Sequence, residues 1–203
     1  MDLNEAIYQR RSCRRYLDRE VGAPAIHFLL KAAVQAPSAL NQQPWVFAVF
    51  HGRDLLRDYS ERAKRHLMAT FPTSMDVHLR TEEFYARPDY DIFHGAGTLI
   101  VIYAALGKLN PAEDCCLAAQ NLMLAAHAAG LGTCPIGFAR PWLDLPETKR
   151  DLGVPESYTA VFPVVVGYPD GEPEPVERRD PEIVSWKWHE ARALAGEPLR
   201  AES

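Results

Sequence analysis

Four arginines and a serine fall within seven consecutive positions of the chain, Arg10-Arg11-Ser12-Cys13-Arg14-Arg15-Tyr16. The chain as a whole is acidic, with 22 Lys and Arg against 27 Asp and Glu and a net charge of −5. A guanidinium group presents a planar fork of donors that matches phosphate oxygens, and a serine hydroxyl adds a short, directional hydrogen bond. This segment therefore predicts a site for an anionic, phosphorylated ligand.

A purely electrostatic role for these arginines is the main alternative. Apolar residues recur at helical spacing over residues 3–10, so we expect a short amphipathic helix capped by Asp2. Cations near a helix C terminus are favourable because they face the negative end of its dipole, and this explanation suits Arg11 and Arg15 best. Nucleic-acid binding is not expected, because the chain has no broad basic face and no interleaving of aromatic with basic residues.

A second segment with ligand-binding potential is Ala36-Pro37-Ser38-Ala39-Leu40-Asn41-Gln42-Gln43-Pro44-Trp45. It follows a predicted helix over residues 24–35, which begins at Pro24 because proline favours the first helical position, and which ends before Pro37. Its serine and amide side chains supply hydrogen-bond donors and acceptors. Together the two segments favour a binding site over a simple cluster of charge.

Apolar runs of strand length and helical spacing predict the elements that must position these segments. Buried strands are expected over residues 45–50 (on both faces), 99–104 and 159–167, helices over 55–67 and 141–152, and an extended segment over 131–138. Pro163 cannot donate to a strand ladder, so we expect a bulge or an unpaired side there. Helices and isolated strands separated by long connections favour an α+β fold.

One further predicted helix is apolar on almost every side. Asn110-Pro111-Ala112-Glu113 is a strong start signal, with a capping residue, a proline at the first helical position and an acid in the first turn. From Asp114 to about Ala129, polar side chains are few, and Gly130 follows. Because a helix that is apolar all round must be covered all round, we expect a second copy of the chain to cover part of it.

Length and composition favour one globular domain over residues 1–203, with 47% hydrophobic and 24% charged residues. The chain does not open on a basic and then apolar leader, and its longest apolar run, residues 99–106, is too short to span a bilayer. A cytoplasmic protein with no membrane partner is therefore expected.

Several common catalytic patterns are missing from the sequence. The four cysteines form no C-x-x-C pair, the seven histidines lack metal-binding spacing, and there is no G-x-S-x-G elbow, so no metal site and no serine hydrolase is expected. Residues 130–137 imitate a dinucleotide-binding signature but follow a helix and carry Pro135 in place of the third glycine. A Rossmann domain is therefore not expected.

Four motifs, in their order along the chain, resemble those of the FMN-dependent nitroreductase family. Arg10-Arg11-Ser12-x-Arg14-x-Tyr16 resembles the opening motif of that family, and Ala36-Pro37-Ser38-x-x-Asn41-x-Gln43-Pro44-Trp45 its second signature. Residues 118–133 resemble the central helix and the turn after it. Val165-Val166-Gly167-Tyr168-Pro169 and then Arg178-Arg179 resemble the last strand and a C-terminal basic element.

The resemblance implies an α+β fold with a central, mostly antiparallel sheet flanked by helices, in an intertwined homodimer with FMN at the interface. It places the phosphate and ribityl chain at Arg10, Ser12 and one or both of Arg178 and Arg179, with Arg11 beside them. Arg14 would lie nearer the pyrimidine end of the flavin ring, where a fixed cation stabilises developing negative charge. Ile136 and Gly137 would line the ring, with the Gly137 N–H as a donor to flavin N5. Pro37, Ser38 and Asn41 would contact the flavin, some of them from the partner chain.

The activity that the resemblance implies is a ping-pong reaction, in which NADH or NADPH reduces the flavin and a nitroaromatic, quinone or similar electron-poor acceptor reoxidises it. No residue of the protein is then required as a catalytic acid or base, because the cofactor carries the chemistry. Alternatives within the same fold are a reductive dehalogenase and a flavin-fragmenting dimethylbenzimidazole synthase. Alternatives of other classes are a non-catalytic dimeric flavin carrier or sensor, and a protein that binds another phosphorylated ligand without flavin.

Three segments depart from the family pattern or leave its details open. No acidic residue follows Ile136, where family members often carry one, so acceptor preference stays open. Residues 70–95 show no pattern and read as an irregular, lid-like segment. The C-terminal extension over residues 170–203 carries aromatic side chains that we expect to pack on the core or on a partner subunit.

Overall fold

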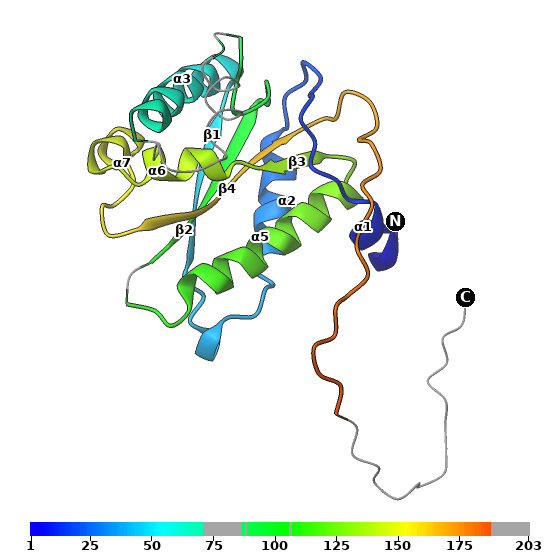
Figure 1. Cartoon of the computed structure of the whole chain (residues 1–203). Coiled ribbons are helices and arrows are strands. Elements are labelled where there is room, and N and C mark those ends of the chain that lie inside the picture. The colour runs from blue at the N-terminus through cyan, green and yellow to red at the C-terminus, as the bar shows by residue number, and fades with distance from the viewer. Residues whose placement is uncertain (71–86, 88, 106, 188–203) are drawn as a thin grey trace, which may run out of the picture.

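The computed structural model describes residues 1–70, 87, 89–105 and 107–187 of the chain. Its centre is a four-stranded, fully antiparallel sheet in the order β1-β2-β4-β3 (Figure 1). The strands are β1 (Trp45–His51), β2 (Thr98–Ala104), β3 (Gly132–Pro135) and β4 (Thr159–Gly167). The predicted combination of helices with a mostly antiparallel sheet is confirmed, and the pairing is not that of a Rossmann domain.

Helices cover both faces of the sheet, so the fold has three layers (Figure 1). One face carries α2 (Ala23–Ala33) and α5 (Pro111–Ala128), with α1 (Leu3–Gln9) against the end of α5. The other face carries α3 (Arg53–Thr70), α6 (Arg140–Leu143) and α7 (Pro146–Leu152). The described residues also form two 3-10 turns, η1 (Ala39–Asn41) and η2 (Gly137–Ala139). Alternate residues of β2 enter the two cores, which is why all seven of its residues are buried.

The local signals at the start of α1 are confirmed. The Asp2 side chain accepts a hydrogen bond from the Glu5 N–H, and the Glu5 carboxylate accepts one from the Asp2 N–H, which makes a capping box. The helix ends at Gln9, and Arg10 is its C-cap. The helix therefore ends where the run of arginines begins, and the first arginine of the run caps it.

Three local predictions are wrong in part. Strand β1 is an edge strand and is only half-buried, because it pairs with β2 alone. The predicted helix over 141–152 is two helices, since Pro146 restricts Leu145 to an extended conformation (φ −62°, ψ 135°) that breaks the helix. Helix α5 begins at Pro111 as expected, but Asn110 is left-handed and makes no capping bond through its side chain.

The bulge expected near Pro163 is present two residues earlier. The register between β2 and β4 shifts so that Ile102 faces Phe162 and Tyr103 faces Ala160, which leaves Val161 as the extra residue. Pro163 itself pairs with Val101, and its carbonyl accepts a hydrogen bond from the Ile136 N–H at 2.9 Å. Pro163 has no N–H to donate, and it lies just beyond the last paired residues of β3 and β4, where no donor is required.

Candidate functional site

The segment from Arg10 to Tyr16 is fastened to the end of the sheet. Ser12 bridges to Thr133 in parallel pairing, and Tyr16 bridges to Pro169 in antiparallel pairing. The Cys13 N–H donates to the Thr133 carbonyl at 2.9 Å. The backbone between the arginines is thereby held along β3 and the end of β4, and the arginine side chains are left to project from a fixed support.

Two glycines permit this close approach. A Cβ on Gly132 would lie 2.7 Å from the Cys13 Cβ, and a Cβ on Gly167 would lie 2.6 Å from the Tyr16 Cδ1. Tyr16 is held in place at its other end, where its hydroxyl donates to the Cys13 carbonyl at 2.7 Å. Any larger residue at either glycine would push the arginine segment off the sheet.

The arginine side chains gather around one cavity of about 580 Å³. Its lining includes Arg10, Ser12, Arg178 and three carboxylates from the start of the C-terminal extension, with the other arginines of the segment also present. Five guanidinium groups against three carboxylates leave a net charge of +2. Burial, and then repulsion by Arg178 and Arg11, lower the pKa of Arg10.

Not every predicted arginine has the same surroundings. Arg11 donates to the carbonyl groups of Tyr8 and Arg10, at 2.6 and 2.8 Å, so it stabilises the C terminus of α1 as the electrostatic alternative predicts. Arg178 reaches the cavity, whereas Arg179 is not among the residues that line it.

A second cavity, of about 460 Å³, adjoins the first at Arg14, which lines both. Its walls come from the end of β3, from η2 and from the turn before β2: Tyr90, Ile92, His94, Cys134, Pro135, Ile136, Gly137 and Phe138. The predicted ring-side residues Ile136 and Gly137 are thus brought together with Arg14. A Cβ on Gly137 would meet no atom within 4 Å, so the space above this backbone is open.

Cys134 lies in the wall of the second cavity, where its Sγ contacts the Pro135 carbonyl oxygen at 3.6 Å. Burial raises the pKa of the Cys134 thiol, and the positive charge of Arg14 opposes this shift. The thiol is therefore protonated at neutral pH within a mostly apolar wall.

The segment with Pro37, Ser38 and Asn41 lies at the opposite end of α5 from the arginines (Figure 1). The Ala39 N–H donates to the Asp114 carboxylate in the first turn of α5, at 3.1 Å. The arginine end of the same helix is marked by His127, whose pKa is lowered by burial and then by Arg10 and Arg11. Thirteen residues of helix at 1.5 Å each put about 20 Å between these ends. One chain therefore does not bring this segment to the arginine cavity.

The backbone of this segment is strained. Leu40, Asn41 and Gln43 are all left-handed, with φ of 51°, 54° and 47°. The Ser38 hydroxyl accepts from the Gln43 N–H at 2.9 Å and holds the loop closed. Strain of this kind persists where the surrounding structure imposes it and is concentrated at functional sites.

Tyr90, Ile92 and His94 are wall residues that the sequence pattern did not identify. They belong to the predicted irregular segment, of which residues 71–86 and 88 lie outside the described residues. The sequence does carry a signal for this turn, because Asp91 and Gly95 are the residue types that close a tight turn just before an apolar strand.

In the described parts of the chain, no group of three or more His, Cys, Asp or Glu side chains could hold a metal ion. Among the same residues, none of the helices has the length and apolar character needed to cross a membrane.

The chain matches the family model described as "Nitroreductase family" over residues 7–168. A relative in Archaeoglobus fulgidus, which carries the provisional name NADH dehydrogenase/NAD(P)H nitroreductase, is 31% identical over 174 residues that cover 86% of this chain and 89% of the relative. Among solved structures, a nitroreductase with bound FMN from Bacteroides fragilis NCTC 9343 has a TM-score of 0.75 and 27% identity, covering 94% of this chain and all of that chain. An oxidized iodotyrosine deiodinase bound to FMN and 3-iodo-L-tyrosine has a TM-score of 0.70 and 25% identity, covering 93% of this chain and all of that one. The opening motif, the antiparallel sheet between helices and these matches agree, and the chain belongs to the Nitroreductase family.

Proposed function

We propose that this oxidoreductase of the Nitroreductase family binds FMN and transfers electrons from NADH or NADPH to nitroaromatic, quinone or similar electron-poor acceptors. The observation that carries the proposal is the pair of cavities that meet at Arg14, one lined by arginines and the other mostly apolar. A phosphorylated molecule with a flat ring requires such a combination of surfaces. Bound there, FMN would supply the two-electron chemistry.

The charge of the first cavity fits the phosphate end of FMN. A phosphate monoester carries close to two negative charges at neutral pH, and the cavity has a net charge of +2. Arg10, Ser12 and Arg178 would hold the phosphate, and its charge would relieve the repulsion that lowers the pKa of Arg10.

The second cavity fits the ring end. Arg14 would stand at the pyrimidine edge, where a fixed guanidinium stabilises negative charge on the ring. The open space above Gly137 allows a ring to approach the backbone, and the Gly137 N–H has no main-chain acceptor among the described residues. Ile136 supports the ring from an apolar wall.

A homodimer would complete the site. Two copies of α5 packed antiparallel about a two-fold axis would place the start of one helix beside the end of the other. Pro37, Ser38 and Asn41 of one subunit would then reach the arginine cavity of its partner. Leu40 is 81% exposed in the single chain and Leu117 on α5 is 46% exposed, which is the apolar surface that such an interface would cover.

The C-terminal extension is proposed to pack on the partner in the same dimer. Its described part, residues 170–187, is exposed along its whole length in the single chain, and Trp186 is 70% exposed. An aromatic side chain of this size gains free energy when it is buried.

We expect the purified protein to scatter light as a species of close to twice the 22.8 kDa chain mass. Leu117→Glu should shift it to a monomer and weaken FMN binding, because a carboxylate would be buried at the interface. Leu55→Glu is the matched control, since Leu55 is 40% exposed on α3, away from α5. A monomeric wild-type protein at micromolar concentration would contradict the shared site.

Initial-rate kinetics test the reaction itself. Because NADH and the acceptor would use the same ring-side cavity in turn, rates with NADH and 1,4-benzoquinone should give parallel lines in double-reciprocal plots. Intersecting lines would contradict a shared cavity.

The similarity to an FMN-bound iodotyrosine deiodinase favours one alternative function, that of a reductive dehalogenase. Iodide release from 3-iodo-L-tyrosine under reducing conditions, faster than benzoquinone turnover, would support that reading.

A further inference from the structure

The turn before β2 is a rigid wall of the ring-side cavity. The Asp91 carboxylate accepts hydrogen bonds from the N–H groups of Phe93 and Gly95, at 2.9 and 2.8 Å. Ile92 and Phe93 are buried in the core that α3 covers. The turn therefore has its own internal closure and two apolar anchors.

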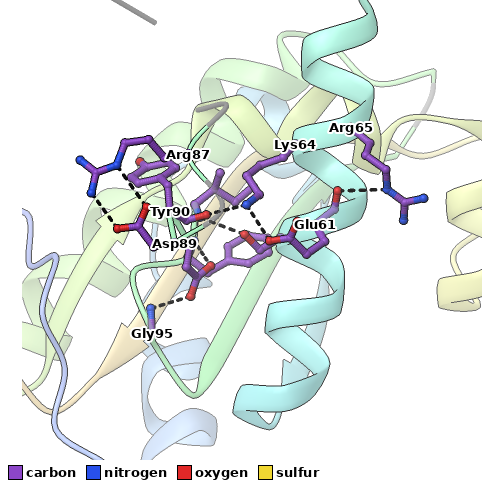
Figure 2. Close-up of polar contacts among 11 residues, drawn as sticks. Glu61, Lys64, Arg65, Arg87, Asp89, Tyr90 and Gly95 are labelled. Atoms are coloured by element: carbon purple, nitrogen blue, oxygen red, sulfur yellow. Dashed lines mark hydrogen bonds and ion pairs between the residues drawn. The ribbon is translucent and has the colours of Figure 1, made fainter. Parts of the chain in front are cut away.

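Polar side chains of helix α3 hold the turn in place (Figure 2). The Lys64 ammonium group donates to the Tyr90 carbonyl at 2.8 Å and pairs with Glu61 at 2.6 Å. The Ser60 hydroxyl accepts from the Ile92 N–H at 3.0 Å. These bonds from buried polar side chains hold the main chain of the turn in one position.

Tyr90 and His94 are the side chains with polar atoms that this turn contributes to the cavity. The backbone of His94 is left-handed, with φ of 58°, and Gly95 follows at φ of 71°. A non-glycine residue is uncommon at such a φ, although histidine adopts it more often than most, and residues held there are concentrated at functional sites. The imidazole and the Tyr90 ring meet edge to face, at 6.1 Å between centroids and 77° between planes.

The imidazole has hydrogen-bonding capacity to offer a ligand. Within the described residues, no hydrogen-bond partner is found for either of its ring nitrogens. Burial lowers the pKa of His94, Arg14 lowers it further, and the Asp91 carboxylate opposes both. The ring is therefore neutral at pH 7, with one N–H donor and one acceptor nitrogen.

On the proposed function, we infer that His94 is a specificity-determining residue on the acceptor side of the cavity. Its N–H donates a hydrogen bond to an acceptor oxygen, a nitro oxygen or a quinone carbonyl. Arg14 and Gly137 already account for the polar groups on the cofactor side, and Ile92, Ile136 and Phe138 give the cavity its apolar walls. A polar donor in such a pocket selects ligands that carry an oxygen opposite it, because a ligand without one leaves the donor unpaired.

The test separates the two half-reactions by rapid mixing of the FMN-loaded protein. His94→Gly removes the ring and suits the left-handed backbone, and His94→Asn suits that backbone and keeps a shorter N–H donor. After reduction by NADH, His94→Gly should be reoxidised by 1,4-benzoquinone about fivefold to tenfold more slowly than wild type, which corresponds to one lost hydrogen bond. The rate of reoxidation of His94→Asn should lie between those of wild type and His94→Gly. Reoxidation by ferricyanide, which needs no hydrogen bond from the wall, should be unchanged.

His27→Gln, on the exposed surface of α2, is the matched control and should leave every rate unchanged. Equal rates of reoxidation by benzoquinone in wild type and His94→Gly would overturn the inference. Loss of FMN from His94→Gly would also overturn it, because the imidazole would then contact the cofactor and not the acceptor. A wild-type protein that binds FMN but is not reduced by either nicotinamide would instead overturn the proposed function, so the two failures are distinguishable.

Discussion

Alanine at position 167 should destabilise the protein by about 1–3 kcal/mol, the usual effect of forcing an extra carbon into a closely packed site. The new Cβ would lie 2.6 Å from the Tyr16 Cδ1 and within 3.3 Å of two further ring atoms. The Tyr16 ring cannot swing away freely, because its hydroxyl is bonded to the Cys13 carbonyl. We therefore expect Gly167→Ala to lower the urea midpoint and to weaken FMN binding at the same time.

Gly97→Ala is the matched control, because the nearest atom to its new Cβ is the Arg53 Cγ at 4.0 Å. Combining Gly167→Ala with Tyr16→Ala should show a favourable coupling, since the clash disappears with the ring. A Gly167→Ala protein with the wild-type urea midpoint and FMN affinity would show that the arginine segment does not depend on this contact.

Arg14→Ala should raise the Kd for FMN by about 10-fold to 100-fold, which corresponds to the loss of a hydrogen bond to a charged group. Arg14 is exposed and lines both cavities, so its removal alters the site rather than the core. The free energy of unfolding of the protein without FMN should stay within about 0.5 kcal/mol of wild type. Reduction of bound FMN by NADH should also slow, because negative charge on the ring loses its partner.

Arg57→Ala provides the comparison for Arg14→Ala. Arg57 is an exposed arginine on α3 whose pairing with Asp54 at 3.4 Å is within the same helix. It should change neither FMN affinity nor the rate of reduction. Unchanged affinity and rate in Arg14→Ala itself would show that Arg14 is not at the pyrimidine end of the ring.

Much of the fold follows from short-range signals in the sequence. Strand β2 and helix α5 were predictable because continuous apolar runs and a proline start signal do not depend on distant residues. Strand β1 has the same apolar character as β2 but lies at the edge of the sheet. Strand order depends on long-range pairing, which an apolar run does not encode.

The candidate site was predictable to the extent that it is continuous in sequence. Arg10, Ser12 and Arg14 were found because they are neighbours, and Arg178 could be linked to them only through family resemblance. His94 was missed because its significance depends on a turn that three side chains of α3 and of the turn itself hold against the cavity. No periodicity in the sequence records such an arrangement.

The central claim is most directly tested by the absorbance spectrum of the purified protein, recorded with added FMN and then after anaerobic addition of NADH and, separately, NADPH. We predict a flavin spectrum that stays with the protein through desalting and is bleached by at least one nicotinamide. A protein that remains colourless after FMN addition and desalting would contradict the account, and would leave the arginine cavity as a site for another phosphorylated ligand.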